Sequence, residues 1–199
     1  MPRIGLFGGT FNPIHNGHIL CPENLVKRNI LDKVIFIPSY MPPLKKNPAN
    51  ISPEMRLEMV RLAVSPYPFF QVSDMEIKRQ GTSYTIDTVK QLRQAYPKDD
   101  LTIILGTDWG MRFHEWKDYE ALSEIVNFVV MQREGSKEDM DNPLLSEPVR
   151  KKLAGAIVSV PAVPVSSSEI RKKINDKAFL RKYLPEKVYR YIEEKKLYQ

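Results

Sequence analysis

The sequence has few cysteines and histidines and no long apolar run. Cys21 is the single cysteine among 199 residues, which excludes an internal disulfide and a zinc site built from several cysteines. No apolar run is long enough to cross a bilayer, and Pro2 and Arg3 lead into an expected strand rather than into a signal peptide. We therefore expect a cytoplasmic protein without a membrane partner.

Two common phosphate-binding signatures are also missing. The sequence contains no Gly-Lys-Ser/Thr, which excludes a Walker-type loop. It contains no Gly-x-Gly-x-x-Gly either, which argues against an ordinary dinucleotide fingerprint. A phosphate site in this chain must therefore be built in another way.

The composition is that of an ordinary globular protein, with 42% hydrophobic and 27% charged residues. A chain of this length fits one domain, so we expect a single domain over residues 1–199, with a C-terminal subregion over about 162–199. The net charge of +6 suits polyanionic small molecules or nucleic acid. Because the basic pairs are dispersed and no RNA-binding signature with clustered aromatics is present, we expect no nucleic-acid partner. The sequence allows a homo-oligomer.

Six apolar runs alternate with helical patterns along the chain. They cover residues 4–7, 34–38, 69–73, 101–105, 127–133 and 156–161. Runs without polar alternation are typical of parallel strands that are covered on both faces. We therefore predict an α/β fold with a doubly wound, Rossmann-like parallel sheet of about six strands and a helical C-terminal end. We expect the third strand to continue towards residues 76–78. Pro22 either lies in the first turn of the helix predicted over 18–30 or bends that helix.

The stretch 8–18, GGTFNPIHNGH, connects the first strand to this helix. Glycines allow a tight turn, and the unpaired amides of a helix N-terminus favour a phosphate. His15 and His18 are three residues apart and project to the same side, where imidazoles can donate hydrogen bonds to phosphoryl oxygens. The alternative is that both histidines are turn or capping residues.

A second stretch, 165–171 (VSSSEIR), predicts another helix start. Ser166 and Glu169 have the spacing of a capping box, so hydroxyls and free amides lie at the positive end of a helix. Arg171 is one turn further on, where a guanidinium can bind a phosphate through two hydrogen bonds. We expect a second anion site that faces the first across the sheet; the alternative is an ordinary capped helix.

These two stretches carry a resemblance to a known superfamily. Residues 8–18 resemble the GGTFDPIHxGH signature of the nucleotidyltransferases, with Asn12 in place of the usual aspartate. Residues 165–171 are similar to the ISSTxIR motif, with Ser168 in place of threonine. The resemblance covers essentially the whole chain.

Four segments in between are similar to the nicotinate mononucleotide adenylyltransferases in particular. They are a PPHK-like stretch at 42–45 with Leu44 in place of histidine, an SYTxDT segment at 83–88, a GxDxLxxFxxWxxxxxL-like pattern from Gly106 to Leu122, and R-x-G at 133–135. Arg56 matches the RLxM helix of this family, and we expect it to support the lysine loop.

The resemblance implies transfer of the adenylyl group of ATP to nicotinate mononucleotide, giving deamido-NAD and pyrophosphate in NAD biosynthesis. It implies catalytic roles for His18, His15 and Arg171. It implies ATP contacts by Gly8, Gly9, Thr10, Phe11, His15, Gly17, His18, Gly106, Asp108, Ser167, Ser168 and Arg171. It implies nicotinate mononucleotide contacts by Lys45, Thr85, Trp116 and Arg133.

Magnesium is the expected cofactor, held mainly by the ATP phosphates and water because no dedicated carboxylate cluster is visible. Some implied roles have structural alternatives: Lys45 as a solvated loop lysine, Thr85 as a helix cap and Trp116 as a core residue. Two other functions stay open. One is transfer to nicotinamide mononucleotide or to the acceptor of another HxGH transferase, and the other is a non-catalytic nucleotide-binding regulatory module.

Overall fold

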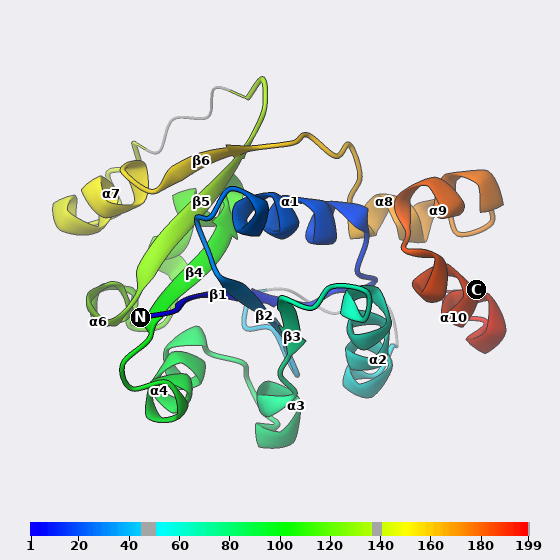
Figure 1. Cartoon of the computed structure of the whole chain (residues 1–199), viewed down its shortest axis with the longest axis horizontal. Helices are drawn as coiled ribbons and strands as arrows, with labels where there is room; N and C mark the ends of the chain where they lie inside the picture. The colour runs from blue at the N-terminus through cyan, green and yellow to red at the C-terminus, as the bar shows by residue number, and fades with distance from the viewer. Residues whose placement is uncertain (45–50, 137–140, 199) are drawn as a thin grey trace.

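The structure is a computed structural model, and it describes residues 1–44, 51–136 and 141–198. Six strands form one parallel sheet in the order β3-β2-β1-β4-β5-β6 (Figure 1). The strands are β1 Arg3–Gly9, β2 Lys33–Pro38, β3 Phe70–Val72, β4 Asp100–Gly106, β5 Asn127–Arg133 and β6 Ile157–Val160. The expected α/β fold with a doubly wound sheet is confirmed.

The strand order places the start of the chain in the middle of the sheet. β1 pairs with β2 on one side and with β4 on the other, so the chain direction of the crossovers reverses between β1 and β4. Ligands of open parallel sheets bind at such a switch point, outside the carboxyl ends of the strands. The loop after β1 therefore lies where a ligand site is expected.

Helices cover both faces of the sheet (Figure 1). The helices are α1 Asn16–Lys27, α2 Pro53–Val64, α3 Met75–Arg79, α4 Thr85–Ala95, α5 Thr107–Met111, the 3₁₀ helix η1 Phe113–Glu115, α6 Tyr119–Ile125, α7 Glu147–Ala154, α8 Ser167–Lys172, α9 Lys177–Tyr183 and α10 Glu186–Lys195. No helix in the described ranges is long and apolar enough to cross a membrane.

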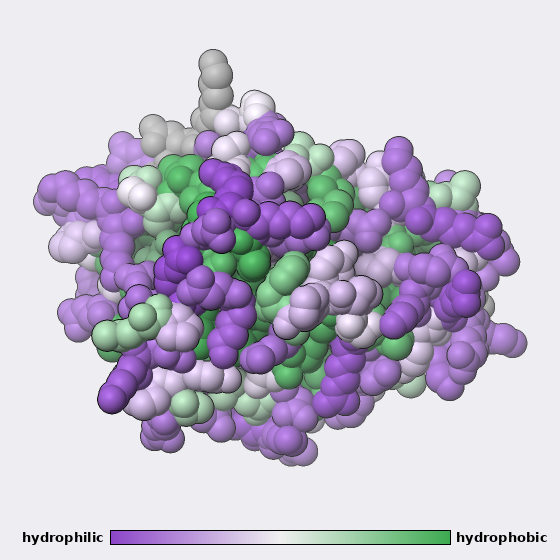
Figure 2. Space-filling view, in the orientation of Figure 1, coloured by the Kyte–Doolittle hydropathy of each residue, from purple (hydrophilic) through white to green (hydrophobic). Residues whose placement is uncertain are grey.

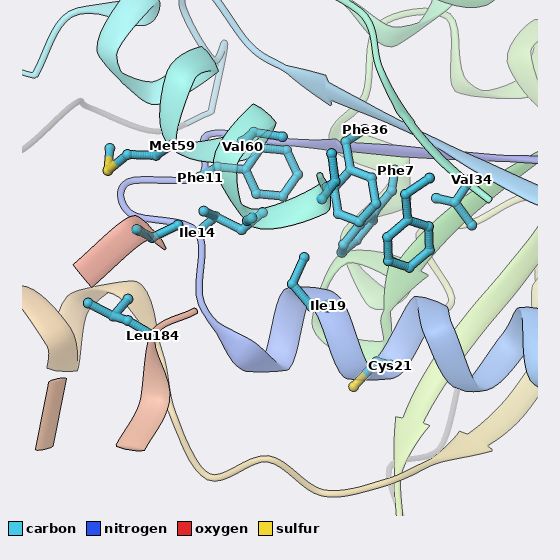
Figure 3. Packing of buried hydrophobic residues seen from close by; sticks show 14 of the residues in the cluster. Phe7, Phe11, Ile14, Ile19, Cys21, Val34, Phe36, Met59, Val60 and Leu184 are labelled. Atoms are coloured by element: carbon cyan, nitrogen blue, oxygen red, sulfur yellow. The ribbon is translucent and has the colours of Figure 1, made fainter. Parts of the chain in front are cut away.

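Each face of the sheet has its own hydrophobic core. One core joins β1 and β2 to α1, α2 and the helices α8 to α10, and it includes Phe7, Phe36 and Leu184. Figure 3 shows Phe7 and Phe36 beside each other above α1, with Leu184 at the other end of the same cluster. The second core joins the opposite face to α4, α6 and α7. The C-terminal helices are thus anchored to the first strand. Figure 2 shows that mostly hydrophilic residues cover the outer surface of α9 and α10.

Three local expectations differ from the structure. The third strand does not continue, because residues 75–79 form the helix α3. β3 is an edge strand, and its ladder ends where the Ser73 N–H donates to the Phe36 carbonyl at 2.9 Å. α1 begins at Asn16 instead of His18 and continues through Pro22, which lies beyond the first turn. The sequence analysis also did not predict α9.

Candidate active site

The loop after β1 turns at Phe11. Gly8 and Gly9 are still part of β1, so the turn that the glycine pair suggested comes two residues later. Phe11 has a φ of 48°, a conformation that bulky residues rarely adopt, and its side chain is buried. Its ring lies edge-on to the rings of Phe7 and His18, with centroid distances of 5.7 and 5.2 Å. Figure 3 shows Phe11 in the same cluster as Phe7. Phe11 therefore supports the histidine from the core side.

The two histidines lie against each other at the start of α1. Their ring centroids are 3.7 Å apart and the rings are inclined by 30°. The His15 backbone N–H donates to Nδ1 of His18 at 3.2 Å. Because Nδ1 accepts this hydrogen bond, the neutral His18 ring carries its proton on Nε2. A Cβ on Gly17 would lie 3.1 Å from the His15 ring, so the glycine gives this ring its space.

His15 is the more buried of the pair. Burial, with a smaller effect of the Arg133 charge, lowers the pKa of His15 from 6.5 to about 4. His15 is therefore a neutral imidazole at pH 7. Its buried Nδ1 has no hydrogen-bond partner among the described residues.

Side chains from distant segments hold the carbonyl groups of this loop. Arg56, fully buried on α2, donates to the Thr10 carbonyl at 2.7 Å and to the Tyr40 carbonyl at 3.0 Å. Ser167 Oγ donates to the Pro13 carbonyl at 2.8 Å, and Arg171 Nη1 donates to the Asn12 carbonyl at 2.5 Å. A peptide carbonyl and the following N–H point in opposite directions. The hydrogen bonds to the Thr10 and Pro13 carbonyls therefore set the directions of the Phe11 and Ile14 N–H groups.

The second predicted anion site does not face the first across the sheet. Its residues bind the first loop directly, because α8 and α1 lie in the same layer and share one core. Ser166 caps α8 by accepting the Glu169 N–H at 3.1 Å. The Glu169 carboxylate pairs with Lys173 at 3.2 Å, so only the serine half of the predicted capping box is confirmed. Arg171 Nη2 also donates to Ser168 Oγ at 3.1 Å.

An apolar cavity opens beside the loop, at the carboxyl ends of β1 and β4. Its walls include five residues implied by the sequence: Gly8, Gly9, Thr10, Thr85 and Gly106. Trp116 also lines the cavity, and its ring packs 5.1 Å from that of Phe113. Trp116 is partly buried against the second core and also lines the cavity, so its packing role is confirmed and its contact with the acceptor stays a prediction.

The structure adds residues to the cavity that the sequence analysis did not assign to a site. Among them are Ser39, Glu76, Tyr84, Thr88, Trp109 and Lys117. Lys117 directly follows Trp116, and its ammonium lies 4.6 Å from the centroid of the Tyr84 ring. Its position next to Trp116 in the sequence is the feature from which Lys117 could have been predicted as a site residue. Glu76 gave no signal, because it lay in an expected strand.

Glu76 belongs to a polar network at the cavity wall. The Thr88 hydroxyl donates to its carboxylate at 2.6 Å and accepts from Arg79 at 2.9 Å. Burial raises the pKa of Glu76, against the opposing effect of hydrogen bonds from Thr88 and Ser83. The Ser83 hydroxyl also accepts the Tyr40 N–H at 2.9 Å, so Ser83 joins two loops instead of capping α4.

Two predicted contacts, Arg133 and Asp108, are not among the described residues that line the cavity, and a third cannot be placed. Lys45 lies outside the described residues. Arg133 ends β5 and is not among the described residues that line the cavity, although its charge lowers the pKa of His15. Asp108 lies in the first turn of α5, and its carboxylate is so close to Gly106 that a Cβ there would approach it to 2.7 Å. In residues 1–44, 51–136 and 141–198, no three His, Cys, Asp or Glu side chains converge on a metal position.

Comparison with known proteins identifies the family. The cytidylyltransferase-like family matches residues 6–173. The chain belongs to the cytidylyltransferase-like family. Among its relatives is a "Probable nicotinate-nucleotide adenylyltransferase" of Citrifermentans bemidjiense, 41% identical over 98% of both chains. The "Nicotinate-nucleotide adenylyltransferase" of Bacillus subtilis is 36% identical over the full length of both.

A solved structure also has this cytidylyltransferase-like fold. It is the nicotinic acid mononucleotide adenylyltransferase of Plasmodium falciparum complexed with NaAD, with a TM-score of 0.76. The match covers all of this chain and 98% of the other at 20% identity, so it shows the shared fold.

Proposed function

We propose that the protein transfers the adenylyl group of ATP to nicotinate mononucleotide, releasing pyrophosphate and forming the deamido-NAD dinucleotide. The observation that carries this proposal is the direct contact of the two sequence motifs beside one apolar cavity. The contact gathers imidazoles, hydroxyls and a guanidinium next to a pocket for a flat ring. Relatives of 36–41% identity over nearly the whole chain carry the name of this activity.

The reaction requires no nucleophile from the protein. The 5′-phosphate of the acceptor has a second pKa near 6, so it is largely dianionic at neutral pH and attacks the α-phosphorus of ATP in line. Catalysis is then mostly positioning and stabilisation of charge. His15 and His18 hold the α-phosphate, and Nε2–H of His18 donates to the charge that develops there.

The β- and γ-phosphates belong at the junction of the two motifs. Thr10, Ser167, Ser168 and Arg171 supply hydroxyls and a guanidinium around one short piece of backbone. Arg171 already donates to the Asn12 carbonyl and to Ser168, so it orders this junction as well as contributing positive charge. Gly106 and Asp108 contact the adenosine from the end of β4.

The cavity beside Thr10 suits the acceptor. The Trp116 indole stacks on the pyridine ring, and a cationic pyridinium adds a cation–π attraction of roughly 0.5–2 kcal/mol. Thr85 contacts the ring from the first turn of α4, and Lys45 contacts the acceptor phosphate. The Lys117 ammonium at the cavity wall adds positive charge for an acidic acceptor. The backbone of Arg133, at the end of β5, contacts the nicotinate ring of the acceptor.

Magnesium suits this site as part of the nucleotide complex. Mg²⁺ usually keeps several waters and binds through phosphates with one or two carboxylates, so it needs no cluster of protein ligands. When bound, it neutralises the pyrophosphate leaving group.

Pyrophosphate release from MgATP tests the proposal, with nicotinate and nicotinamide mononucleotide as parallel acceptors. Strong preference for the acid is the expected result. Equal preference would keep the chemistry and make the enzyme dual in its acceptor, and reversed preference would change the acceptor to the amide. No release with either acceptor, from folded protein that binds ATP, would contradict the enzymatic function and favour a regulatory nucleotide-binding module.

A further inference from the structure

A tyrosine from the other end of the sequence contacts the loop after β1. The hydroxyl of Tyr198 donates to Oδ1 of Asn12 at 2.6 Å, across 186 positions of the chain. Asn12 is buried, and its backbone carbonyl accepts from Arg171. One loop residue is therefore held through both its side chain and its main chain.

The segment after α10 is shaped to bring this hydroxyl to Asn12. Leu197 is buried in the core, which anchors the segment. Lys196 and Tyr198 have φ values of 50° and 67°. Lys196 ends α10 in the left-handed conformation that is common after a helix, whereas a bulky residue such as Tyr198 rarely adopts it. The buried Leu197 next to Tyr198 and the buried Asn12 opposite it therefore fix the direction of the Tyr198 side chain.

The charged groups near Tyr198 are the two arginines that hold the loop after β1. Burial raises the pKa of Tyr198, and the charges of Arg171 and Arg56 act in the opposite direction. These two arginines donate to the carbonyls of Asn12 and Thr10. Tyr198 thus lies among the groups that fix residues 10–13, and it is neutral at physiological pH.

We propose that Tyr198 is a positioning residue for adenylyl transfer, which acts through Asn12 to hold the loop that carries His15 and His18. The inference rests on the proposed function, because the loop matters for catalysis only if the histidines meet the α-phosphate. An amide at position 12 accepts the hydrogen bond without adding negative charge beside the phosphates of ATP. Loss of the Tyr198 bond should displace the histidines without removing any group that touches substrate.

Tyr198→Phe removes the hydroxyl and keeps the ring, so it is the primary variant. Tyr191→Phe is the matched control, because its ring also packs on the core from α10. Steady-state rates would be measured with the full chain at saturating MgATP and nicotinate mononucleotide, well below each melting temperature. Hydrogen exchange of peptides covering residues 8–18 reports on the loop independently of activity.

The expected result for Tyr198→Phe is a roughly tenfold fall in kcat with an unchanged KM for the acceptor, and faster exchange over residues 8–18. Tyr191→Phe should match wild type. Asn12→Asp keeps an acceptor oxygen and should retain most of the activity, whereas Asn12→Ala should lower kcat at least as far as Tyr198→Phe. If the tyrosine acts through Asn12, the double variant Asn12→Ala/Tyr198→Phe will be no slower than Asn12→Ala.

Wild-type kcat and exchange in Tyr198→Phe, or effects of the two substitutions that multiply, would overturn the proposal. Faster loop exchange and weaker ATP binding in Tyr198→Phe, with no transfer by wild type, would support the loop contact and contradict the proposed function. Failure of the Tyr198 proposal and failure of the proposed function therefore give different results.

Discussion

The His15 N–H donates to Nδ1 of His18 while the two rings lie 3.7 Å apart. The main chain of one histidine thus sets the tautomer of the other. His18 consequently presents Nε2–H as a donor, and the pKa of His15, lowered by burial to about 4, keeps the His15 ring neutral beside it at pH 7. The pair is suited to bind one phosphate group from one side.

Replacement of His18 by Asn should lower kcat about 10²–10³-fold, the usual cost of losing one donor aimed at a transition state. The asparagine amide can still meet the His15 N–H, so the fold should persist, as judged by circular dichroism and melting temperature. His114→Asn is the control, since His114 lies in η1 and contacts Asn142 instead of the loop after β1. Unchanged turnover in His18→Asn would refute the assigned role.

The buried His15 should make stability depend on pH. The unfolded chain binds a proton on His15 near pH 6.5, whereas the folded chain does so only near its pKa of about 4. Between these values the unfolded state binds more protons, so this contribution to stability is present above pH 6.5 and is lost as pH falls towards 4. Urea unfolding at pH 7 and pH 4.5 should show wild type losing about 2 kcal/mol more than His15→Gln. Equal losses would mean that His15 is not buried as described.

Arg56→Met should destabilise the fold and weaken ATP binding together. The substitution leaves the Thr10 and Tyr40 carbonyls unpaired in the interior, at about 1–3 kcal/mol for each buried group. Arg61→Met on the same helix is the control, because its exposed ion pairs with Glu58 and Asp74 are worth at most about 1 kcal/mol. Urea unfolding and ATP titration measure both effects, and similar values for the two variants would contradict the buried contacts.

Gly106→Ala should impair ATP binding without unfolding the protein. The new Cβ would lie 2.7 Å from Asp108 Oδ1, and the flexible carboxylate would move aside before the strand did. Loss of a hydrogen bond to a charged group corresponds to a roughly tenfold rise in KM for ATP. Gly155→Ala, at the end of α7, has only ordinary contacts and should leave this KM unchanged. An unaltered KM in Gly106→Ala would exclude Asp108 as an adenosine contact.

The strands were predictable because each is a short apolar run bounded by turn residues, as at Val34 and Leu101. The short helix α3 was not, since five residues at the end of an edge strand give too little periodicity. His15, His18 and Arg171 could be found from local patterns. The contacts of Arg56 with Thr10 and of Tyr198 with Asn12 depend on tertiary packing between distant segments, which no local pattern encodes.

The loop at residues 10–13 precedes in the sequence the four side chains that hold it. Arg56 follows within the first third of the chain, whereas Ser167, Arg171 and Tyr198 are 154, 159 and 186 positions from the groups they bind. Contacts of such long sequence separation form late, because their closure costs the most chain entropy. A chain that has folded only its N-terminal part therefore holds both histidines without the side chains that fix the backbone of residues 10–13.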